Sequence, residues 1–487
     1  MKNITEAAPR RTERPLRVLQ FGEGNFLRAF VDYMIDIANE KQVFNGSAAI
    51  VKPIPFGSLD AFREQDNLYT VILRGRENGR KVNEVRIVTS VSEVLGCAED
   101  TDRFFGLAQE KDIRFIVSNT TEAGIVFDPS DSFEGLPSTY PGKLTKWLYE
   151  RYKTFDGACD KGVIILPVEL IENNGGKLKE CVFSLCGVWG LPSGFREWLE
   201  SSCVFCSTLV DRIVTGYPKA EAEELCRALG YTDRLLDVGE PFALWVIESE
   251  KDISAELPLD KAGLPVVFTR DLTPYRDRKV RVLNGAHTAS VLAGWLCGLD
   301  IVRDCMNDPL LGQFIRRVVR EEIAPQVKLP PDEVSAFAES VFERFDNPFI
   351  DHSLLSISLN SVSKWKARVL PSFRDYYASE QKLPRLMSFS LAALAAFYSS
   401  SDLQEDGLHA VRADGREYTV RDDAEVLEFF RNNSGKNADE FIRLFLSDKD
   451  FWGEDLTEYQ GLAETVSRQL SELRADPAAA VAKVLKG

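Results

Sequence analysis

The sequence contains very little histidine and lacks the residue groupings that common metal sites need. Only three histidines occur in 487 residues, His287, His352 and His409. Of the nine cysteines, only Cys203 and Cys206 have C-x2-C spacing, and no second cysteine pair or histidine pair stands beside them at zinc-site spacing. We therefore predict that the protein has no metal site and that the cysteines are reduced, buried thiols, as is usual in the cytosol.

The sequence also has no apolar run of membrane length. Its longest run, Leu386 to Tyr398, falls well short of the roughly 20 residues that a spanning helix needs, and we expect a buried helix there. The N-terminal segment MKNITEAAPRRTERPLR is polar and basic, without the apolar core of a secretory signal. We therefore expect a cytoplasmic protein without a membrane partner.

An excess of basic residues is absent as well. Lys and Arg number 59 against 75 Asp and Glu, a net charge of −16, which argues against nucleic acid as a partner because phosphate binding needs a basic face. A small anionic substrate would need a local cluster of Lys or Arg to hold it. The length of 487 residues, 44% of them hydrophobic, is too great for one ordinary core and predicts two domains.

Short apolar runs alternate with helical patterns in the first half of the chain. Residues 26–40 repeat apolar side chains at helical spacing and are expected to form the first helix. Continuous apolar runs separated by helices predict a mainly parallel, doubly wound α/β sheet. The expected strands are LRVLQF (16–21), AAIVKPI (48–54), YTVILRG, RIVTSVSEV, IRFIVSNT and KGVIILPVELI.

The second half of the chain is predicted to be mostly helical. Residues 309–327 place their apolar side chains on one helical stripe, and SFSLAALAAFYSS and DAEVLEFFRNN also have helical patterns. One hairpin is expected in AVRADGREYTV, where Asp414-Gly415 is a turn signal. We therefore place an α/β domain at residues 1–276 and a mostly α-helical substrate and catalytic domain at residues 277–487.

A glycine turn joins the first expected strand to the first expected helix. Such a turn lets backbone N–H groups approach a pyrophosphate, as in Rossmann-like domains. The third glycine of G-x-G-x-x-G is absent because position 27 is leucine, so the turn alone fits a dinucleotide site or an ordinary strand-to-helix connection. The surrounding alternation of strands and helices favours the dinucleotide site. Its predicted cofactor-binding residues are Phe21, Gly22, Glu23, Gly24, Asn25, Phe26 and Arg28.

Two later strand ends also concern the cofactor. The second expected strand ends with Lys52 and has no acidic residue for the ribose hydroxyls, and this lysine would tolerate a 2′-phosphate, so NAD and NADP both remain open on this motif. A later strand ends in SNTTE (118–122). There Asn119, Thr121 and Glu122 either line the nicotinamide side of the site or cap the next helix.

Three polar side chains that suit carbonyl reduction occur close together at Lys279, Asn284 and His287. On a helix, offsets of five and eight residues spread them over a limited arc, which a long lysine can cross. The lysine would donate a proton to the carbonyl oxygen, the asparagine amide would hold the developing alkoxide, and the histidine would orient a hydroxyl. Spacing alone also allows a core histidine and a solvated lysine at the start of a helix.

These segments resemble the mannitol dehydrogenase family of polyol-specific long-chain dehydrogenases over nearly the whole chain. Lys279, Asn284 and His287 match that family's K-x5-N-x2-H motif. The resemblance implies that Lys279 is the general acid/base, Asn284 an oxyanion-hole donor and His287 a substrate-orienting residue, with no catalytic metal. It also implies a monomer or a small homo-oligomer. The matching V-D-R-I segment (210–213) offers Asp211-Arg212 either as a structural ion pair or as a substrate contact.

The sequence departs from the mannitol enzymes of the family at positions near the substrate. Leu170 stands where they carry a second oxyanion asparagine, and Ser356 stands in place of a substrate-binding arginine. Asn174 matches a later asparagine, Lys364 matches a substrate-binding lysine, and both are predicted to bind substrate. These changes argue against mannitol itself.

The segments LQFGEGNFLRAF, SNTTEAGI, STLVDRIVTGYP and LNGAHTA resemble a branch of the family that acts on sugar acids. That resemblance implies reversible, NADH-dependent reduction of D-tagaturonate to D-altronate. Lys364, Lys366 or Arg368 would then hold the substrate carboxylate by a charge-assisted hydrogen bond. Two alternatives stay open: the same chemistry on D-fructuronate or a neutral polyol or ketose, and a nucleotide-binding redox sensor without catalysis.

Overall fold

The computed structural model of the chain describes residues 1–9 and 12–486, which form two compact units. The first unit contains residues 1–74 and 81–272, and the second contains residues 75–80 and everything from residue 273 onward. The division between Leu272 and Thr273 lies close to the boundary near 276 that we expected. The short insertion 75–80 was not expected. It is the tip of a β-hairpin, and the backbone N–H of Asn78 donates to Glu343 of the second unit.

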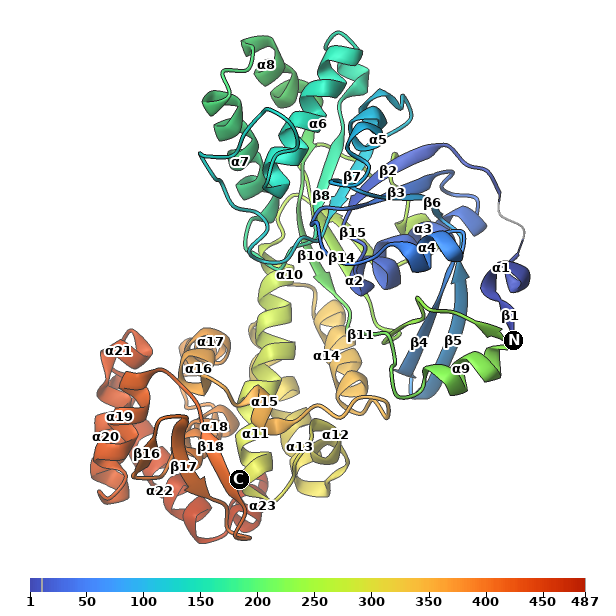
Figure 1. Ribbon diagram of the computed structural model, residues 1–487. Helices are drawn as coiled ribbons and strands as arrows, with labels where there is room; N and C mark the ends of the chain where they lie inside the picture. The colour runs from blue at the N-terminus through green and yellow to red at the C-terminus, as the bar shows by residue number, and fades with distance from the viewer. Residues whose placement is uncertain (10–11, 487) are drawn as a thin grey trace. The chain divides into compact units, whose positions relative to one another are not determined.

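A six-stranded, entirely parallel sheet forms the centre of the first unit (Figure 1). Its strand order is β6-β3-β2-β7-β8-β9, which confirms the doubly wound fold predicted from the alternating pattern. The strands are β2 (Leu16–Phe21), β3 (Ser47–Lys52), β6 (Val91–Gly96), β7 (Phe115–Ser118), β8 (Ile164–Pro167) and β9 (Val204–Phe205). The carboxyl ends of β2, β3 and β7 are adjacent, since Phe21 pairs with Val51 on one side and with Ser118 on the other.

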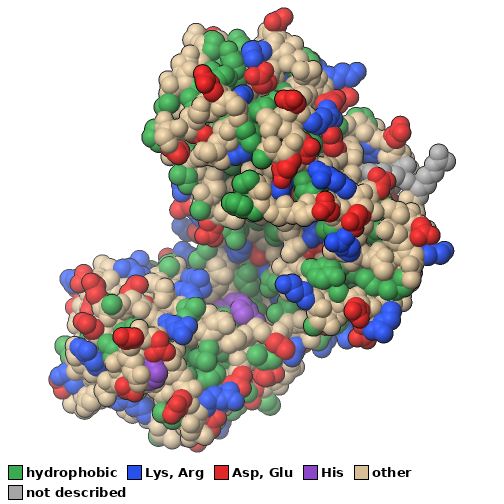
Figure 2. All heavy atoms as spheres, viewed as in Figure 1, with side chains coloured by type: hydrophobic (Ala, Val, Ile, Leu, Met, Phe, Trp, Pro, Cys, Tyr) green, Lys and Arg blue, Asp and Glu red, His purple; other side chains and the backbone are tan. Residues whose placement is uncertain are grey.

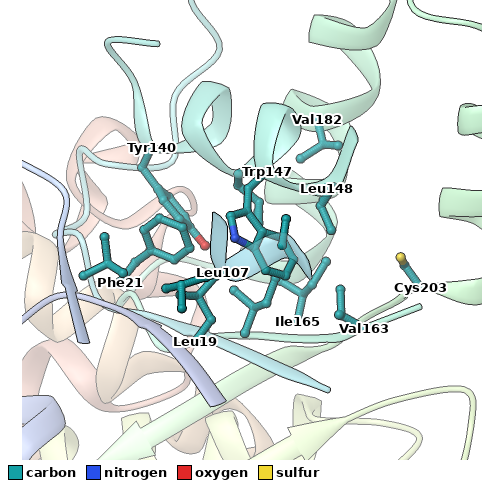
Figure 3. Close-up of a cluster of buried hydrophobic side chains, with 14 of the residues drawn as sticks. Leu19, Phe21, Leu107, Tyr140, Trp147, Leu148, Val163, Ile165, Val182 and Cys203 are labelled. Atoms are coloured by element: carbon teal, nitrogen blue, oxygen red, sulfur yellow. The ribbon is translucent and has the colours of Figure 1, made fainter. Parts of the chain in front are cut away.

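Helices cover both faces of this sheet because its strands are apolar on both sides. On one face, Trp147 and Leu148 of α6 pack against Leu19 and Ile165, as Figure 3 shows. The helical segments of this unit are α1 (Ile4–Ala7), α2 (Asn25–Leu27), η1 (Arg28–Asp32), α3 (Tyr33–Glu40), α4 (Asp60–Glu64), α5 (Thr101–Gly106), η2 (Leu107–Gln109), α6 (Tyr140–Thr154), η3 (Cys159–Lys161), α7 (Asn174–Val188), α8 (Ser193–Ser202), α9 (Ala222–Leu229) and η4 (Asp260–Ala262).

Two of the expected strands differ from the prediction of a single sheet. YTVILRG lies in β4 of a separate four-stranded sheet, in the order β11-β13-β4-β5. RIVTSVSEV is not one strand, because Thr89 and Ser90 break it into the end of β5 and the start of β6, which belong to different sheets. The remaining strands of the unit are β1 (Lys2–Asn3), β4 (Tyr69–Glu77), β5 (Arg80–Val88), β10 (Ser207–Asp211), β11 (Val214–Gly216), β12 (Tyr231–Thr232), β13 (Asp237–Gly239), β14 (Leu244–Glu248) and β15 (Val266–Thr269).

The second unit is mostly helical, as predicted. The apolar run that starts at Leu386 lies in a buried helix, α18, which ends at Phe397, and Asp414-Gly415 turns the hairpin β17–β18, with Gly415 at φ +89°. Its elements are α10 (Thr273–Arg278), η5 (Lys279–Asn284), α11 (Gly285–Leu296), α12 (Val302–Asn307), α13 (Pro309–Arg317), η6 (Val318–Ile323), η7 (Ala324–Gln326), α14 (Pro331–Phe345), α15 (Leu354–Ile357), α16 (Ser361–Arg368), α17 (Leu370–Glu380), α18 (Arg385–Phe397), β16 (Asp402–Gln404), β17 (Gly407–Val411), β18 (Glu417–Val420), α19 (Ala424–Asn433), α20 (Ala438–Ser447), α21 (Lys449–Trp452), η8 (Leu456–Glu458), α22 (Leu462–Ala475) and α23 (Pro477–Lys486).

The surface in Figure 2 mixes acidic and basic side chains over the visible face.

Within residues 1–9 and 12–486, no helix is both long and apolar enough to span a membrane. In the same residues, no group of three or more His, Cys, Asp or Glu side chains is placed to hold a metal ion. Cys203 and Cys206 are free, buried thiols, and burial raises the pKa of each to about 12.

Candidate active site

The glycine turn after β2 has the backbone that a phosphate-binding turn needs. Gly22 has φ +120°, and a Cβ atom there would lie 3.0 Å from the carbonyl oxygen of Asn119. Gly24 precedes the helix that begins at Asn25, and a Cβ atom there would meet nothing within 4 Å. No side chain among the described residues caps this helix start, so its first N–H groups are left for an anion. The residues therefore fit a dinucleotide pyrophosphate.

The aromatic and basic side chains of the turn point into the protein and support it. Phe21 is fully buried, with its ring centroid 4.9 Å from that of Tyr140 (Figure 3). Phe26 stacks on Phe30 at 4.9 Å. Arg28 is 4% exposed and donates to the Asn25 side chain and the Leu235 carbonyl. Of these predicted cofactor residues, Phe21 and Arg28 thus hold the turn in place from behind.

The loop after β7 is anchored by a carboxylate that sequence reasoning missed. Glu169 is 2% exposed, and its Oε1 accepts hydrogen bonds from the backbone N–H and the hydroxyl of Thr120, at 2.9 and 3.0 Å. Thr121 has φ +80°, a conformation that a β-branched residue rarely adopts and that is concentrated at functional sites. Glu122 follows this strained residue directly, and Asn119, two residues before it, lies next to Gly22. The available sequence signal was a Glu two residues after an apolar strand.

Asn174 is fully occupied by hydrogen bonds to the backbone. Its Nδ2 donates to the carbonyl oxygens of Pro167, Glu169 and Thr208, and its Oδ1 accepts from the N–H groups of Gly175 and Thr208. The residue is 1% exposed. Its amide has no hydrogen-bonding group left for a substrate in this arrangement, so we leave it out of the proposed site.

We expect Asn174→Ala to destabilise the first unit without slowing the chemistry. Losing the amide leaves several buried backbone groups without a hydrogen bond. Each group that finds no new partner lowers the free energy of unfolding by about 1–3 kcal/mol, so a fall in melting temperature of several degrees is expected. Calorimetry gives the melting temperature, and kcat/KM is measured well below it. A variant with native stability and kcat/KM lowered more than about tenfold, or 1.4 kcal/mol, would instead assign Asn174 to the substrate.

A π-helical turn brings the three predicted catalytic residues to one side of their helix. Lys279–Asn284 forms the π-helical segment η5, which continues directly into α11. In a π-helix, residues five apart are stacked by the i→i+5 hydrogen bond, so Lys279 and Asn284 share a face. His287 follows Asn284 by one α-helical turn of three residues and extends the same face. The sequence offsets alone assumed a regular α-helix, which would have spread these residues further apart.

His287 is held as a neutral imidazole. Its ring stacks on Phe345 with centroids 4.1 Å apart and meets His352 edge-on at 5.3 Å. Burial and the neighbouring His352 hold the pKa of His287 well below its usual value, with further lowering by nearby Arg and Lys side chains. Its Nε2 atom is buried and makes no hydrogen bond within the described residues. A neutral ring with an unused nitrogen can orient a substrate hydroxyl.

The basic side chains close to His287 come from two helices. Lys364 and Arg368 lie one turn apart on α16, and Arg344 lies on α14; all three lower the pKa of His287. Helix α16 packs against the start of α11, because a Cβ atom on Gly285 would lie 3.1 Å from the Arg368 carbonyl oxygen. Lys366 is directed elsewhere and donates to the Asp450 carbonyl at 3.3 Å.

The pH dependence of stability should reveal the buried histidine. Between the ordinary histidine pKa and the lowered pKa of His287, the unfolded chain binds a proton that the folded chain excludes, so stability falls as pH falls below about 6.5. From pH 7 to 5.5, wild type should lose about 1 kcal/mol more than His287→Gln. Urea unfolding at the two pH values measures this difference. Equal losses in both proteins would show that folding does not lower the pKa of His287.

Other residues singled out from the sequence have structural or peripheral positions. Arg212 donates to the carbonyl oxygens of Ala29, Pro241 and Phe242, which ties three segments of the first unit together. Asp308 caps α13 by accepting hydrogen bonds from the N–H groups of Leu310 and Leu311, which is a structural role. Leu170 is 63% exposed directly after β8, and Ser356 is exposed on α15. His409 is a surface residue bonded to Asp406, away from the other two histidines.

Two family models together match most of the chain. The model described as the mannitol dehydrogenase Rossmann domain matches residues 16–261, and that of the mannitol dehydrogenase C-terminal domain matches residues 271–474. Two relatives are both named altronate oxidoreductase. The one from Yersinia enterocolitica is 44% identical over 467 residues, 94% of each chain, and the one from Pectobacterium atrosepticum is 45% identical over 471 residues, 95% of each chain.

Solved structures show the same fold at low sequence identity. A D-sorbitol dehydrogenase in substrate-free form has a TM-score of 0.78 at 19% identity, covering 99% of each chain. The Pseudomonas fluorescens mannitol 2-dehydrogenase, in a ternary complex with NAD and D-mannitol, has a TM-score of 0.64 at 22% identity, covering 97% of this chain and 95% of that one. This likeness extends over both units.

Proposed function

This chain belongs to the mannitol dehydrogenase family and is an oxidoreductase acting on CH–OH groups, and we propose that it reversibly reduces D-tagaturonate to D-altronate with NADH. Two relatives named altronate oxidoreductase, matched over nearly their whole length, support this choice of substrate. The glycine turn at Gly22 and Gly24 and the loop at Asn119–Glu122 are the proposed cofactor contacts. The cofactor, when bound, supplies or accepts the hydride.

The proposed chemistry uses the side chains that share one face of η5 and α11. Lys279 donates a proton to the ketone oxygen during reduction and takes it back during oxidation. The Asn284 amide donates a hydrogen bond to the same oxygen as negative charge develops there. Neutral His287 orients a neighbouring hydroxyl of the sugar acid. No step needs a metal-bound water, since the ammonium and the amide together stabilise the alkoxide.

The observation that carries the choice of a sugar acid is the group of basic side chains around His287. Lys364 and Arg368 are one helical turn apart on α16. Burial lowers the pKa of Lys364, Arg368 lowers it further, and Asp422 opposes the shift. Like charges placed this closely destabilise the fold unless an anion offsets them. A substrate carboxylate is that anion, whereas a neutral polyol offers none. We therefore favour Lys364 and Arg368, the two charges of α16 that act on His287, as carboxylate ligands. The Lys364 ammonium donates to the Ile357 carbonyl at 3.0 Å and has further N–H groups for a carboxylate, whereas Lys366 reaches the Asp450 carbonyl and is left out.

The test is the fall in NADH absorbance with D-tagaturonate, D-fructuronate and D-fructose in parallel. We expect D-tagaturonate to have the highest kcat/KM, by at least about tenfold over D-fructuronate, since the C4 hydroxyl geometry distinguishes two sugar acids with the same carboxylate. Preference for D-fructuronate would keep the carboxylate site and change the substrate. Turnover of D-fructose alone would contradict the sugar-acid proposal. Absence of turnover with every ketone would favour a nucleotide-binding redox sensor.

A further inference from the structure

The end of β3 differs from the usual arrangement in NAD-binding sheets, which place an acidic residue there for the adenosine ribose. This chain has Lys52 at that position, beside the glycine turn. The N–H of Gly22 donates to the Val51 carbonyl at 2.9 Å, and the N–H of Cys97 donates to the Lys52 carbonyl at 3.0 Å. Strand β3 lies between β2 and β6 (Figure 1), and Lys52 at its end pairs with Gly96, the last residue of β6.

The Lys52 ammonium is turned away from solvent and is already neutralised. Its side chain is 1% exposed, and its Nζ donates to Glu99 Oε1 and to the Gly57 carbonyl, each at 2.7 Å. A bulky 2′-phosphate cannot reach an ammonium that is buried to this extent. Lys52 is therefore a positioning residue for the Glu99 carboxylate, and not the phosphate ligand that the sequence alone allowed.

Glu99 presents a carboxylate at the place where the sheet normally offers one. Its side chain is 45% exposed, although Lys52 holds one of its oxygens. The other oxygen lies against Gly96, the last residue of β6, since a Cβ atom on Gly96 would be 2.0 Å from Glu99 Oε2. A side chain at position 96 would displace the carboxylate. The hydrogen bond from Lys52 lowers the pKa of Glu99, which keeps it ionised.

The surroundings add negative charge to this corner of the sheet. Lys52 also acts on the half-buried Glu23 of the glycine turn, where it partly offsets the burial that raises the pKa of that carboxyl. Arg63, a second cation near Glu99, forms ion pairs with Asp60 at 3.9 Å and with Asp100 at 3.5 Å. Lys52 and Arg63 thus face the carboxylates of Glu23, Glu99, Asp60 and Asp100.

We infer that Glu99, fixed by the buried Lys52, selects NAD(H) over NADP(H) by accepting the adenosine-ribose hydroxyls and repelling a 2′-phosphate. The acid that usually ends the second strand has been replaced by one that follows β6, and the buried lysine ties it to the original position. This inference rests on the proposed use of a nicotinamide dinucleotide. It adds a specificity residue that the second-strand motif does not contain.

The test measures the Kd values of NADH and NADPH by nucleotide fluorescence, without substrate. We expect wild type to bind NADH about 100-fold more tightly, because a like charge against a 2′-phosphate and a lost hydrogen bond to a carboxylate act together. Glu99→Gln keeps a hydrogen-bond acceptor for Lys52 but removes the charge. In this variant the ratio of the NADPH Kd to the NADH Kd should fall about tenfold or more, because NADH binds more weakly and NADPH binds more tightly.

Glu93→Gln is the matched control, because Glu93 lies on β6 itself but pairs with Arg103. It should keep the wild-type ratio, and thermal melting verifies that all variants are folded. A wild type without preference, or a folded Glu99→Gln with the wild-type ratio, would overturn the inference while leaving the proposed reaction intact. A wild type that binds neither nucleotide would instead overturn the dinucleotide part of the proposed function.

Discussion

Replacing Lys279 with alanine is expected to lower kcat by about 10³-fold or more, while NADH still binds with nearly wild-type affinity. The lysine is the proposed proton donor, and its removal leaves Asn284 and His287 without an acid for the ketone oxygen. Stopped-flow or steady-state NADH oxidation gives the rate, and nucleotide fluorescence gives the Kd. Because Lys279 lies in the second unit and the glycine turn in the first, cofactor affinity and chemistry should separate cleanly.

Arg281→Ala is the matched control for Lys279→Ala. Arg281 belongs to the same π-helical segment but is paired with Asp375 of α17, so its loss should test only local disturbance of η5. We expect it to retain kcat within a few-fold. Small primary amines should partly restore turnover in Lys279→Ala, which a merely structural role would not allow. Near wild-type rates in Lys279→Ala would remove the proposed acid/base.

The second large effect is expected at Arg368. Arg368→Ala should lower kcat/KM for the sugar acid about 100-fold, since truncating one partner of a charged hydrogen-bonded pair costs on the order of 3 kcal/mol. The loss should be confined to the anionic substrate, and turnover of a neutral ketose should stay constant or rise. Lys364→Ala should act in the same direction, with a double variant less than additive because both side chains hold one carboxylate.

Lys366→Ala tests whether the effect of Arg368 comes from its position at the site or only from a positive charge on α16. Lys366 lies on α16 between the two proposed ligands, but its amine reaches Asp450 on the opposite side. Its removal should leave kcat/KM for the sugar acid unchanged, and Arg368→Lys should recover part of the loss. Equal losses in Lys366→Ala and Arg368→Ala would mean that α16 acts only through general electrostatic attraction.

Elements whose signals are local could be predicted from the sequence. The apolar run before Gly22, the missing Cβ atom at Gly22 and the turn at Asp414-Gly415 each specify a conformation within a few residues, and each has that conformation in the structure. The helical character of residues 386–398 is equally local, since the run is apolar on all sides and is buried. The spacing of Lys279, Asn284 and His287 also predicted that these three side chains lie on one part of a helix.

The fold class and the family could be predicted from residue types and short spacings, and the same spacings proposed Lys279, Asn284 and His287 as catalytic residues. Only the tertiary structure assigned partners. In the structure Lys52 pairs with Glu99, Asn174 forms hydrogen bonds with backbone groups, and Lys366 donates to the Asp450 carbonyl. The helix at Lys279 is a π-helical turn where the sequence predicted a regular α-helix. Such pairings join residues far apart in the chain, and burial and hydrogen-bond satisfaction decide them only after the chain has packed.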